Sequence, residues 1–149
     1  MTTPEDICPD FPEWPDRWAG VKEDVTYGNG LLNAMRPFVV HLISRGLKPK
    51  TLRGHMDNLW LLGGEIIRSV SMFDQYDVPP EENLRRNVDA DGGPYCRHLH
   101  SEFQERSYDA TCRKLHKCLE ATGGSGQQSV GGDSGKAAAD GGPTGAPQR

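Results

Sequence analysis

The sequence predicts an all-α fold, a small bundle of about four helices with an irregular N-terminal arm and a disordered C-terminal tail. Three observations predict it. Apolar residues recur at helical spacing in two consecutive stretches between Gly30 and Val70, and a third such stripe follows near residue 115. No stretch of the sequence sustains the apolar and polar alternation of a strand pair, and residues 95–100 are the one short candidate for an extended segment.

Composition divides the 149 residues into three parts. Residues 1–28 form an acidic arm rich in tryptophan and proline, and residues 29–121 form the helical domain. The remaining part, residues 122–149, is a tail that holds nine of the chain's eighteen glycines. Val130 is the only bulky aliphatic residue of this tail, so the tail cannot bury enough apolar surface to offset the entropy of ordering. We expect it to be disordered.

The arm combines two prolines and two tryptophans in one short segment: Pro12, Trp14, Pro15 and Trp18. Because proline fixes φ and removes a backbone donor, we expect no regular helix over residues 11–18. Two large indole rings favour burial, so we expect the segment to lie across the helical bundle. Alternatively, a tryptophan-rich acidic segment binds a protein partner or imitates DNA.

The first long helix is predicted over residues 30–45, with a kink or a fresh start near Pro37. Gly46 suits the left-handed position that ends a helix. The helix needs a partner to cover its apolar face. The side chains of this face are Leu32, Met35, Val39 and Leu42.

The second long helix is predicted over residues 50–69, and Pro49 fits its first turn. Its interior holds Gly63 and Gly64, each of which costs about 1 kcal/mol relative to alanine. Both glycines fall near the apolar stripe, so we expect a neighbouring helix backbone to approach there, with a functional hinge as the alternative. The stripe consists of Leu52, Met56, Leu59, Ile66 and Val70, widened by Trp60 and Ile67.

Two more helices complete the domain. A short helix over residues 80–88 begins with proline and two acids. The last helix begins either at Ser101, whose hydroxyl forms the capping-box pattern with Gln104, or at Asp109, and it ends near residues 121–123. Its apolar stripe consists of Tyr108, Cys112, Leu115 and Leu119.

The net charge is −4, but the charges are unevenly distributed along the chain. A basic cluster without any acid lies around the join of the two long helices: Arg36, Arg45, Lys48, Lys50 and Arg53. A second basic set lies on the last predicted helix: Arg113, Lys114 and Lys117. Clustered cations indicate contact with a polyanion, and simple solvation of exposed helix faces is the alternative.

Residues 38–52, FVVHLISRGLKPKTL, end one predicted helix in a "Gly, aliphatic, x, Pro, x, Thr" turn and begin the next. This run resembles the N-terminal core-binding (SAM-like) domain of tyrosine recombinases and phage integrases. The likeness covers residues 30–120 in layout and about fifteen residues in detail. The chain also looks similar to short bacterial proteins of this type, which have a fold without an assigned activity.

The resemblance implies a free-standing, non-catalytic DNA-binding module. The catalytic domain of those recombinases carries an arginine, a His-x-x-Arg motif and a tyrosine nucleophile, and no histidine of this chain is followed by arginine three residues later. The expected partner is duplex DNA, bound mainly through its phosphates. Carried over residue by residue, the DNA-facing positions are Lys48, Lys50, Thr51 and Arg53, with His55 nearby.

A protein-interaction module of the same fold without DNA binding is the alternative function. Such a module would use the arm with Trp14 and Trp18, or the surface of the bundle. We find no Gly-rich phosphate loop, no Gly-x-Ser-x-Gly elbow and no convincing pair of nucleophile and base. The sequence therefore predicts no enzyme and no cofactor, and no small-molecule substrate is evident.

A zinc site is a further alternative, because soft ligands recur in the last third of the chain: Cys96, His98, Cys112 and His116. Two of them, Cys112 and His116, share one helix face. However, structural zinc sites usually contain tight pairs such as Cys-x-x-Cys, and Cys112 also belongs to the apolar stripe. We therefore predict no metal.

The sequence also bears on location. It contains no apolar run of the roughly 18 to 20 residues that cross a bilayer. Its first residues, MTTPED, are acidic where a secretory signal is basic and then apolar. We therefore expect a cytoplasmic protein with no membrane partner, in which the four cysteines are reduced thiols.

Overall fold

The computed structural model describes residues 2–122 of the chain, and these residues form an all-α fold. Their β structure is limited to one isolated bridge between Asp89 and Gly92. The predicted fold class is therefore confirmed. In chain order the elements are α1 (Pro4–Ile7), the 3-10 helix η1 (Phe11–Glu13), α2 (Trp14–Trp18), α3 (Lys22–Ser44), α4 (Pro49–Phe73), α5 (Pro80–Asn87) and a last helix over residues 102–122.

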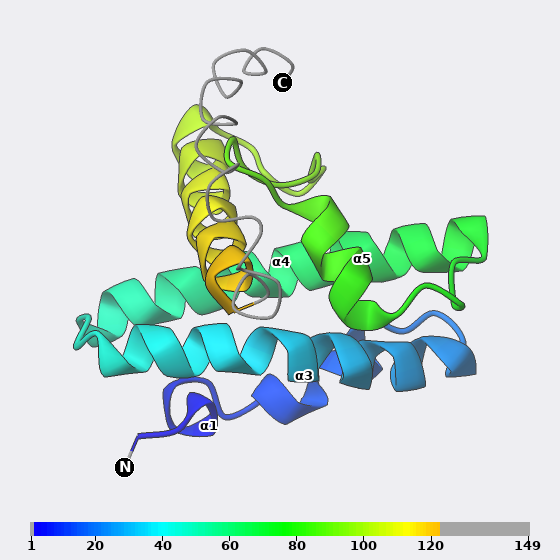
Figure 1. The fold of residues 1–149 in the computed structure, drawn as a ribbon, viewed down its shortest axis with the longest axis horizontal. Helices are drawn as coiled ribbons and strands as arrows, with labels where there is room; N and C mark the ends of the chain where they lie inside the picture. Colours follow the sequence, from blue (N-terminus) through cyan, green and yellow to red (C-terminus); the bar gives the residue numbers. More distant parts are fainter. Residues whose placement is uncertain (1, 123–149) are drawn as a thin grey trace.

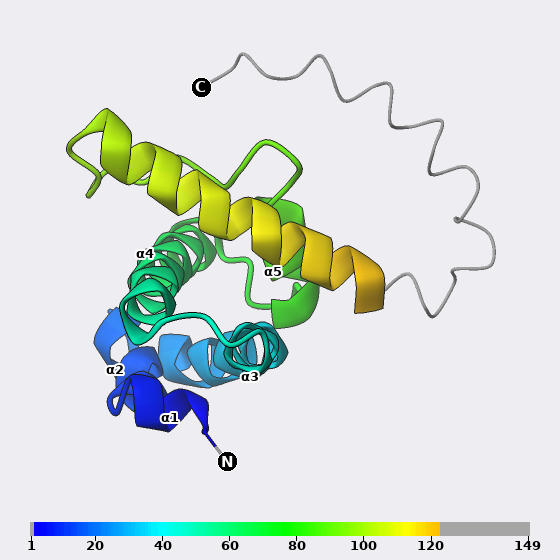
Figure 2. The same ribbon diagram turned by 90° about the vertical axis from the view of Figure 1, so that its left-hand side faces the viewer.

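The long helices α3 and α4 form an antiparallel hairpin through the middle of the molecule (Figure 1). The short elements α1, η1 and α2 lie on one side of this hairpin, while α5 and the last helix lie on the other (Figure 2). The last helix runs across the hairpin rather than along it. One core lies between these layers, and it contains every residue of the predicted apolar stripes except the half-buried Trp60.

Helix α3 is longer than predicted, because it begins at Lys22 rather than near residue 30. Asp24 fixes the chain at this start: its carboxylate accepts hydrogen bonds from the backbone N–H groups of Gly20 (2.8 Å) and Val21 (3.1 Å). The arm therefore ends before Lys22, and α3 runs through the predicted boundary between residues 28 and 29.

Two glycines explain why the sequence places this start too late, since glycine weakens a helical pattern. In the fold, each glycine lets another segment approach α3. A Cβ atom at Gly28 would lie 3.0 Å from Pro15, and one at Gly30 would lie 2.7 Å from the ring of Pro80. Helix α3 also continues through Pro37, so the predicted fresh start at that residue is wrong.

The arm is more regular than predicted. Pro12 and Pro15 each lie in the first turn of a short helix, where the missing backbone donor costs nothing. The expectation of no regular helix over residues 11–18 is therefore wrong, but the expectation that the arm packs on the bundle is confirmed. Trp14 is only 2% exposed, so its ring is not available to a protein partner in the folded chain.

Helix α4 spans the predicted range and extends beyond it to Phe73. Gly63 accommodates a side chain rather than the expected helix backbone, because a Cβ atom there would lie 2.1 Å from the Trp18 ring. That ring is held in place by a hydrogen bond from its indole N–H to the backbone oxygen of Trp60 (3.0 Å). Gly63 therefore leaves the space that the Trp18 ring occupies.

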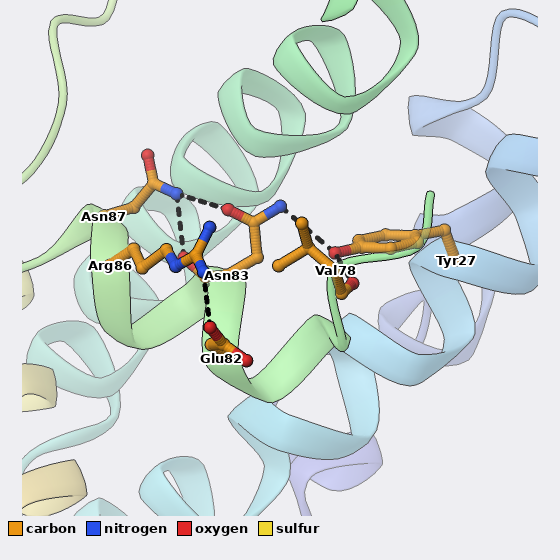
Figure 3. Close-up of polar contacts among 6 residues, drawn as sticks. All are labelled: Tyr27, Val78, Glu82, Asn83, Arg86 and Asn87. Carbon is orange, nitrogen blue, oxygen red and sulfur yellow. Dashed lines mark hydrogen bonds and ion pairs between the residues drawn. The ribbon is translucent and has the colours of Figure 1, made fainter. Parts of the chain in front are cut away.

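Helix α5 confirms the predicted short helix, and a polar network joins it to α3 (Figure 3). The Tyr27 hydroxyl donates to the backbone oxygen of Val78. The side-chain amide of Asn83 donates to the Tyr27 oxygen (3.1 Å), and Asn87 donates to the backbone and side-chain oxygens of Asn83 (2.8 and 2.9 Å). Because Tyr27 and Asn83 are buried, these bonds satisfy groups that water cannot reach.

Ser101 caps the last helix, as the capping-box pattern predicts. The backbone N–H of Gln104 donates to the Ser101 hydroxyl (3.1 Å), and the side-chain oxygen of Gln104 accepts from the backbone N–H of His100 (2.6 Å). The alternative start at Asp109 is wrong. The helix includes residue 122, and the rest of the predicted disordered tail, residues 123–149, lies outside the described residues.

Candidate polyanion-binding site

The turn between α3 and α4 has the conformation that the sequence predicts. Gly46 is left-handed (φ 74°), and its N–H donates to the backbone oxygen of Ile43 (3.1 Å). Lys48 is extended, and Pro49 then opens α4 in its first turn. That first turn contains no acidic residue, so no carboxylate within it offsets the partial positive charge of the helix start.

Four of the five predicted DNA-facing residues are exposed at this helix start: Lys48, Lys50, Thr51 and Arg53. Neither Lys48 nor Lys50 forms an ion pair with a carboxylate of residues 2–122. Arg53 is partly compensated by Asp57: burial raises the pKa of the Asp57 carboxyl, and the charge of Arg53 acts against this rise. The two lysines are therefore the stronger candidates for contact with phosphate.

A groove of about 460 Å³ lies between the C-terminal end of α3 and the end of the last helix. Phe38, Leu42 and Leu47 contribute apolar side chains to its lining, and no acidic residue lines it. Such a groove attracts anions, because positively charged side chains lie beside an apolar wall. We call it the basic groove, and its basic side chains are His41, Arg45, Lys114 and Lys117.

The basic groove is the part of the site that sequence reasoning missed. The basic set on the last helix is visible in the sequence, but its contact with α3 depends on how that helix crosses the hairpin. In the fold, Lys114 and Lys117 join Arg45 in one lining. None of these three cations forms an ion pair with a carboxylate in the part of the chain that the structure describes.

Arg36 does not belong to the site, although the sequence places it in the basic cluster. Its guanidinium donates two hydrogen bonds to the carboxylate of Glu5, at 2.8 and 3.3 Å, and it lies 5.2 Å from the centre of the Phe11 ring. The hydrogen bond from Arg36 also lowers the pKa of the Glu5 carboxyl. Arg36 therefore fastens α1 to α3, and its charge is compensated there.

His55, the fifth predicted DNA-facing residue, lies instead between α4 and the last helix. Its Nδ1 atom is 2.8 Å from the hydroxyl oxygen of Thr111. One turn further along α4, the amide of Asn58 donates to the same hydroxyl (2.8 Å) and to the backbone oxygen of Ser107 (3.1 Å). These bonds join the last helix to α4, so His55 and Asn58 help to hold Lys114 and Lys117 in place.

We expect the stability of the fold to fall as the pH is lowered from about 6.5 to about 5, partly through His55. Burial lowers the pKa of His55, and the charge of Lys114 lowers it further. The unfolded chain therefore binds more protons in this range, so the contribution of neutral His55 is complete above about pH 6.5 and is lost as the pH falls toward the folded-state pKa. Urea unfolding across this range measures the effect.

The matched variant for this test is His55→Gln, which cannot titrate. Its free energy of unfolding should depend less steeply on pH than that of the parent chain over the same range. Equal pH dependence in the two proteins would show that His55 keeps its ordinary pKa in the fold.

The four zinc candidates do not form a cluster. Cys96 and Cys112 are buried, His98 is exposed and His116 is half-buried. Within residues 2–122, no three side chains of histidine, cysteine, aspartate or glutamate come together as a metal site requires. All four cysteines of the chain are thiols, and burial raises the pKa of Cys96 and Cys118.

Comparisons of the chain with protein-family models, with curated proteins and with solved structures found no match. The resemblance to the core-binding domain of tyrosine recombinases therefore stays a prediction. None of the helices in residues 2–122 is long and apolar enough to cross a membrane.

Proposed function

We propose that this chain is a non-catalytic DNA-binding module, similar in role to the core-binding domain of recombinases. The observation that carries the proposal is the basic groove, in which cations from two distant parts of the sequence line one hollow without any acid. Arg45 comes from the end of α3, while Lys114 and Lys117 come from the last helix. The exposed Lys48 and Lys50 at the start of α4 extend the same positive region.

Phosphate contact is the chemistry that this surface supports. Lysine and arginine that neutralise phosphates release condensed counterions, which gives affinity that falls steeply with salt. The backbone N–H groups at the start of α4 can also donate hydrogen bonds to a phosphate oxygen. Such contacts position a duplex but carry little sequence information, so we expect weak sequence selectivity.

The net charge of −4 does not oppose this function, because the acids are concentrated elsewhere. Five acidic residues lie in the arm, before Lys22, and none of them lines the basic groove. In the fold, the short helices of this arm lie on the side of the hairpin opposite to the last helix (Figure 2). The molecule therefore has an acidic side and a basic groove, and a duplex can approach the groove without meeting the arm.

Binding of labelled duplex DNA, followed by fluorescence anisotropy at several salt concentrations, tests the proposal. The triple variant Arg45→Gln, Lys114→Gln, Lys117→Gln should lower affinity at least about tenfold at low salt, and should reduce the slope of log K against log salt by about 3. The variant Lys48→Gln, Lys50→Gln should reduce the slope by about 2.

A second triple variant, Lys22→Gln, Arg86→Gln, Arg106→Gln, is the matched control. It removes the same number of charges from exposed positions that do not line the groove. Its affinity and salt slope should stay near those of the parent chain. Equal losses in both triple variants would show a response to net charge alone, and no binding by the parent at low salt would favour the protein-interaction alternative.

A further inference from the structure

A second hollow, of about 390 Å³, shares no residue with the basic groove. It lies against the C-terminal half of α4, beside α2, the start of α3 and the loop that precedes the last helix. Its volume is in the range of sites that bind small organic molecules. Because residues from four separate segments line it, the fold has to be complete for this hollow to exist. We call it the tryptophan pocket.

Indole rings form the apolar wall of the tryptophan pocket. Trp18 and Trp60 both line it, and their rings are stacked with centroids 5.9 Å apart and planes 27° apart. Both residues are half-buried, so part of each remains accessible to a ligand. Gly64 also lines the pocket, and its missing side chain leaves room beside the rings. The wall is rigid, because Trp18 is hydrogen-bonded to the backbone of Trp60.

Arginine side chains lie along the rim. Arg68 comes from α4 and Arg97 from the loop before the last helix, and both are exposed. Neither forms an ion pair with a carboxylate among the described residues. A third arginine of the lining, Arg17, is already paired with the exposed Glu13 (3.2 Å). The rim therefore offers two guanidinium groups to a ligand.

The two acids of the lining are less exposed than Arg68 and Arg97. Asp24 is buried, and its carboxylate accepts from the Tyr76 hydroxyl (2.7 Å) as well as from two backbone N–H groups at the start of α3. It is therefore occupied within the fold. Glu65 is half-buried and is the one other acid in the lining. Because both carboxylates are less exposed than Arg68 and Arg97, these two guanidinium groups are more accessible to a ligand than either acid.

We propose that the tryptophan pocket binds a small organic anion with a flat aromatic part, such as a nucleoside monophosphate or an aromatic carboxylate. The planar guanidinium groups of Arg68 and Arg97 match the oxygens of a phosphate or carboxylate. The aromatic part of the ligand packs against the indole wall. This binding is separate from the proposed contact with DNA, because the two sites share no residue.

The three tryptophans of the chain provide the measurement. In a proton–nitrogen correlation spectrum each gives one indole N–H signal, and titration with AMP and with benzoate should shift the signals of Trp18 and Trp60 in a saturable way. The neutral analogues adenosine and benzyl alcohol should bind at least about tenfold more weakly, because they lack the charged group. Whether AMP or benzoate binds more tightly shows which anionic group the pocket prefers.

Arg68→Gln combined with Arg97→Gln should weaken binding of the preferred anion at least about tenfold. Arg106→Gln, which changes an exposed arginine outside the pocket, should leave it unchanged. The triple variant of the basic groove should also bind the anion normally. Equal shifts with the neutral analogues, no saturable shift up to about 10 mM, or loss of binding only in the groove variant would each overturn the proposal.

Discussion

Replacing Gly63 with alanine should destabilise the fold by about 1 to 3 kcal/mol, although alanine is the better helix former. The new Cβ atom would lie 2.1 Å from Cζ2 of the Trp18 ring, a distance that no packed pair of carbons tolerates. The ring cannot easily move away, because its N–H is bonded to the backbone of Trp60 and it stacks on the Trp60 ring. Urea unfolding followed by circular dichroism gives the change in the free energy of unfolding.

Two other glycines of α4 serve as matched controls. A Cβ atom at Gly64 would lie 3.5 Å from the Trp18 ring, and one at Gly54 would have no neighbour within 4 Å. Both substitutions to alanine should leave stability unchanged or raise it by up to about 1 kcal/mol through helix propensity. If Gly63→Ala is as stable as Gly64→Ala, the Trp18 ring does not occupy the space beside Gly63. Removing the ring with Trp18→Ala should abolish most of the penalty, since the two sites are in contact.

Replacing Trp14 with alanine should cost about 3 to 5 kcal/mol, the range typical of a large buried aromatic residue. Trp14 is 2% exposed and lies edge-on to Phe11 (4.8 Å between ring centroids) and to Trp60 (5.8 Å). A domain of this size has a total stability of about 5 to 15 kcal/mol, so the loss should bring a substantial unfolded population. Thermal and urea unfolding of the variant measure it.

Phe103→Ala is the control for Trp14→Ala, because Phe103 is 72% exposed. Its effect should stay within about 0.5 kcal/mol. The comparison distinguishes the two roles that the sequence leaves open for the arm. A large loss of stability in Trp14→Ala agrees with packing of Trp14 on the core. A small loss of stability in both variants would instead favour a surface role for Trp14, in which it binds a protein partner.

The sequence predicts the helical framework well, because the signals involved are local. Apolar spacing identifies the buried faces of α3, α4 and the last helix. The pattern of Ser101 and Gln104 gives the start of the last helix, and Gly46 gives the end of α3. Each of these features depends on residues within one or two turns of each other, so no knowledge of the fold is needed to see them.

The errors at glycines occur where a glycine makes room for a distant segment. Gly28 and Gly30 look like weak points of a helix, yet they make room for Pro15 and Pro80. Gly63 makes room for Trp18 in the same way. In sequence such a residue cannot be distinguished from a break, because the atom it accommodates belongs to another part of the chain.

By itself the sequence determined that this protein is a helical bundle, which faces of its helices are buried, and that exposed cations gather at the start of α4. Only the tertiary structure decided which of those cations are available. Arg36 is compensated by Glu5, whereas Arg45 gains Lys114 and Lys117 beside it. The physical reason is that charge acts through space. A basic set along the sequence becomes a site only when folding brings its members together and keeps carboxylates away.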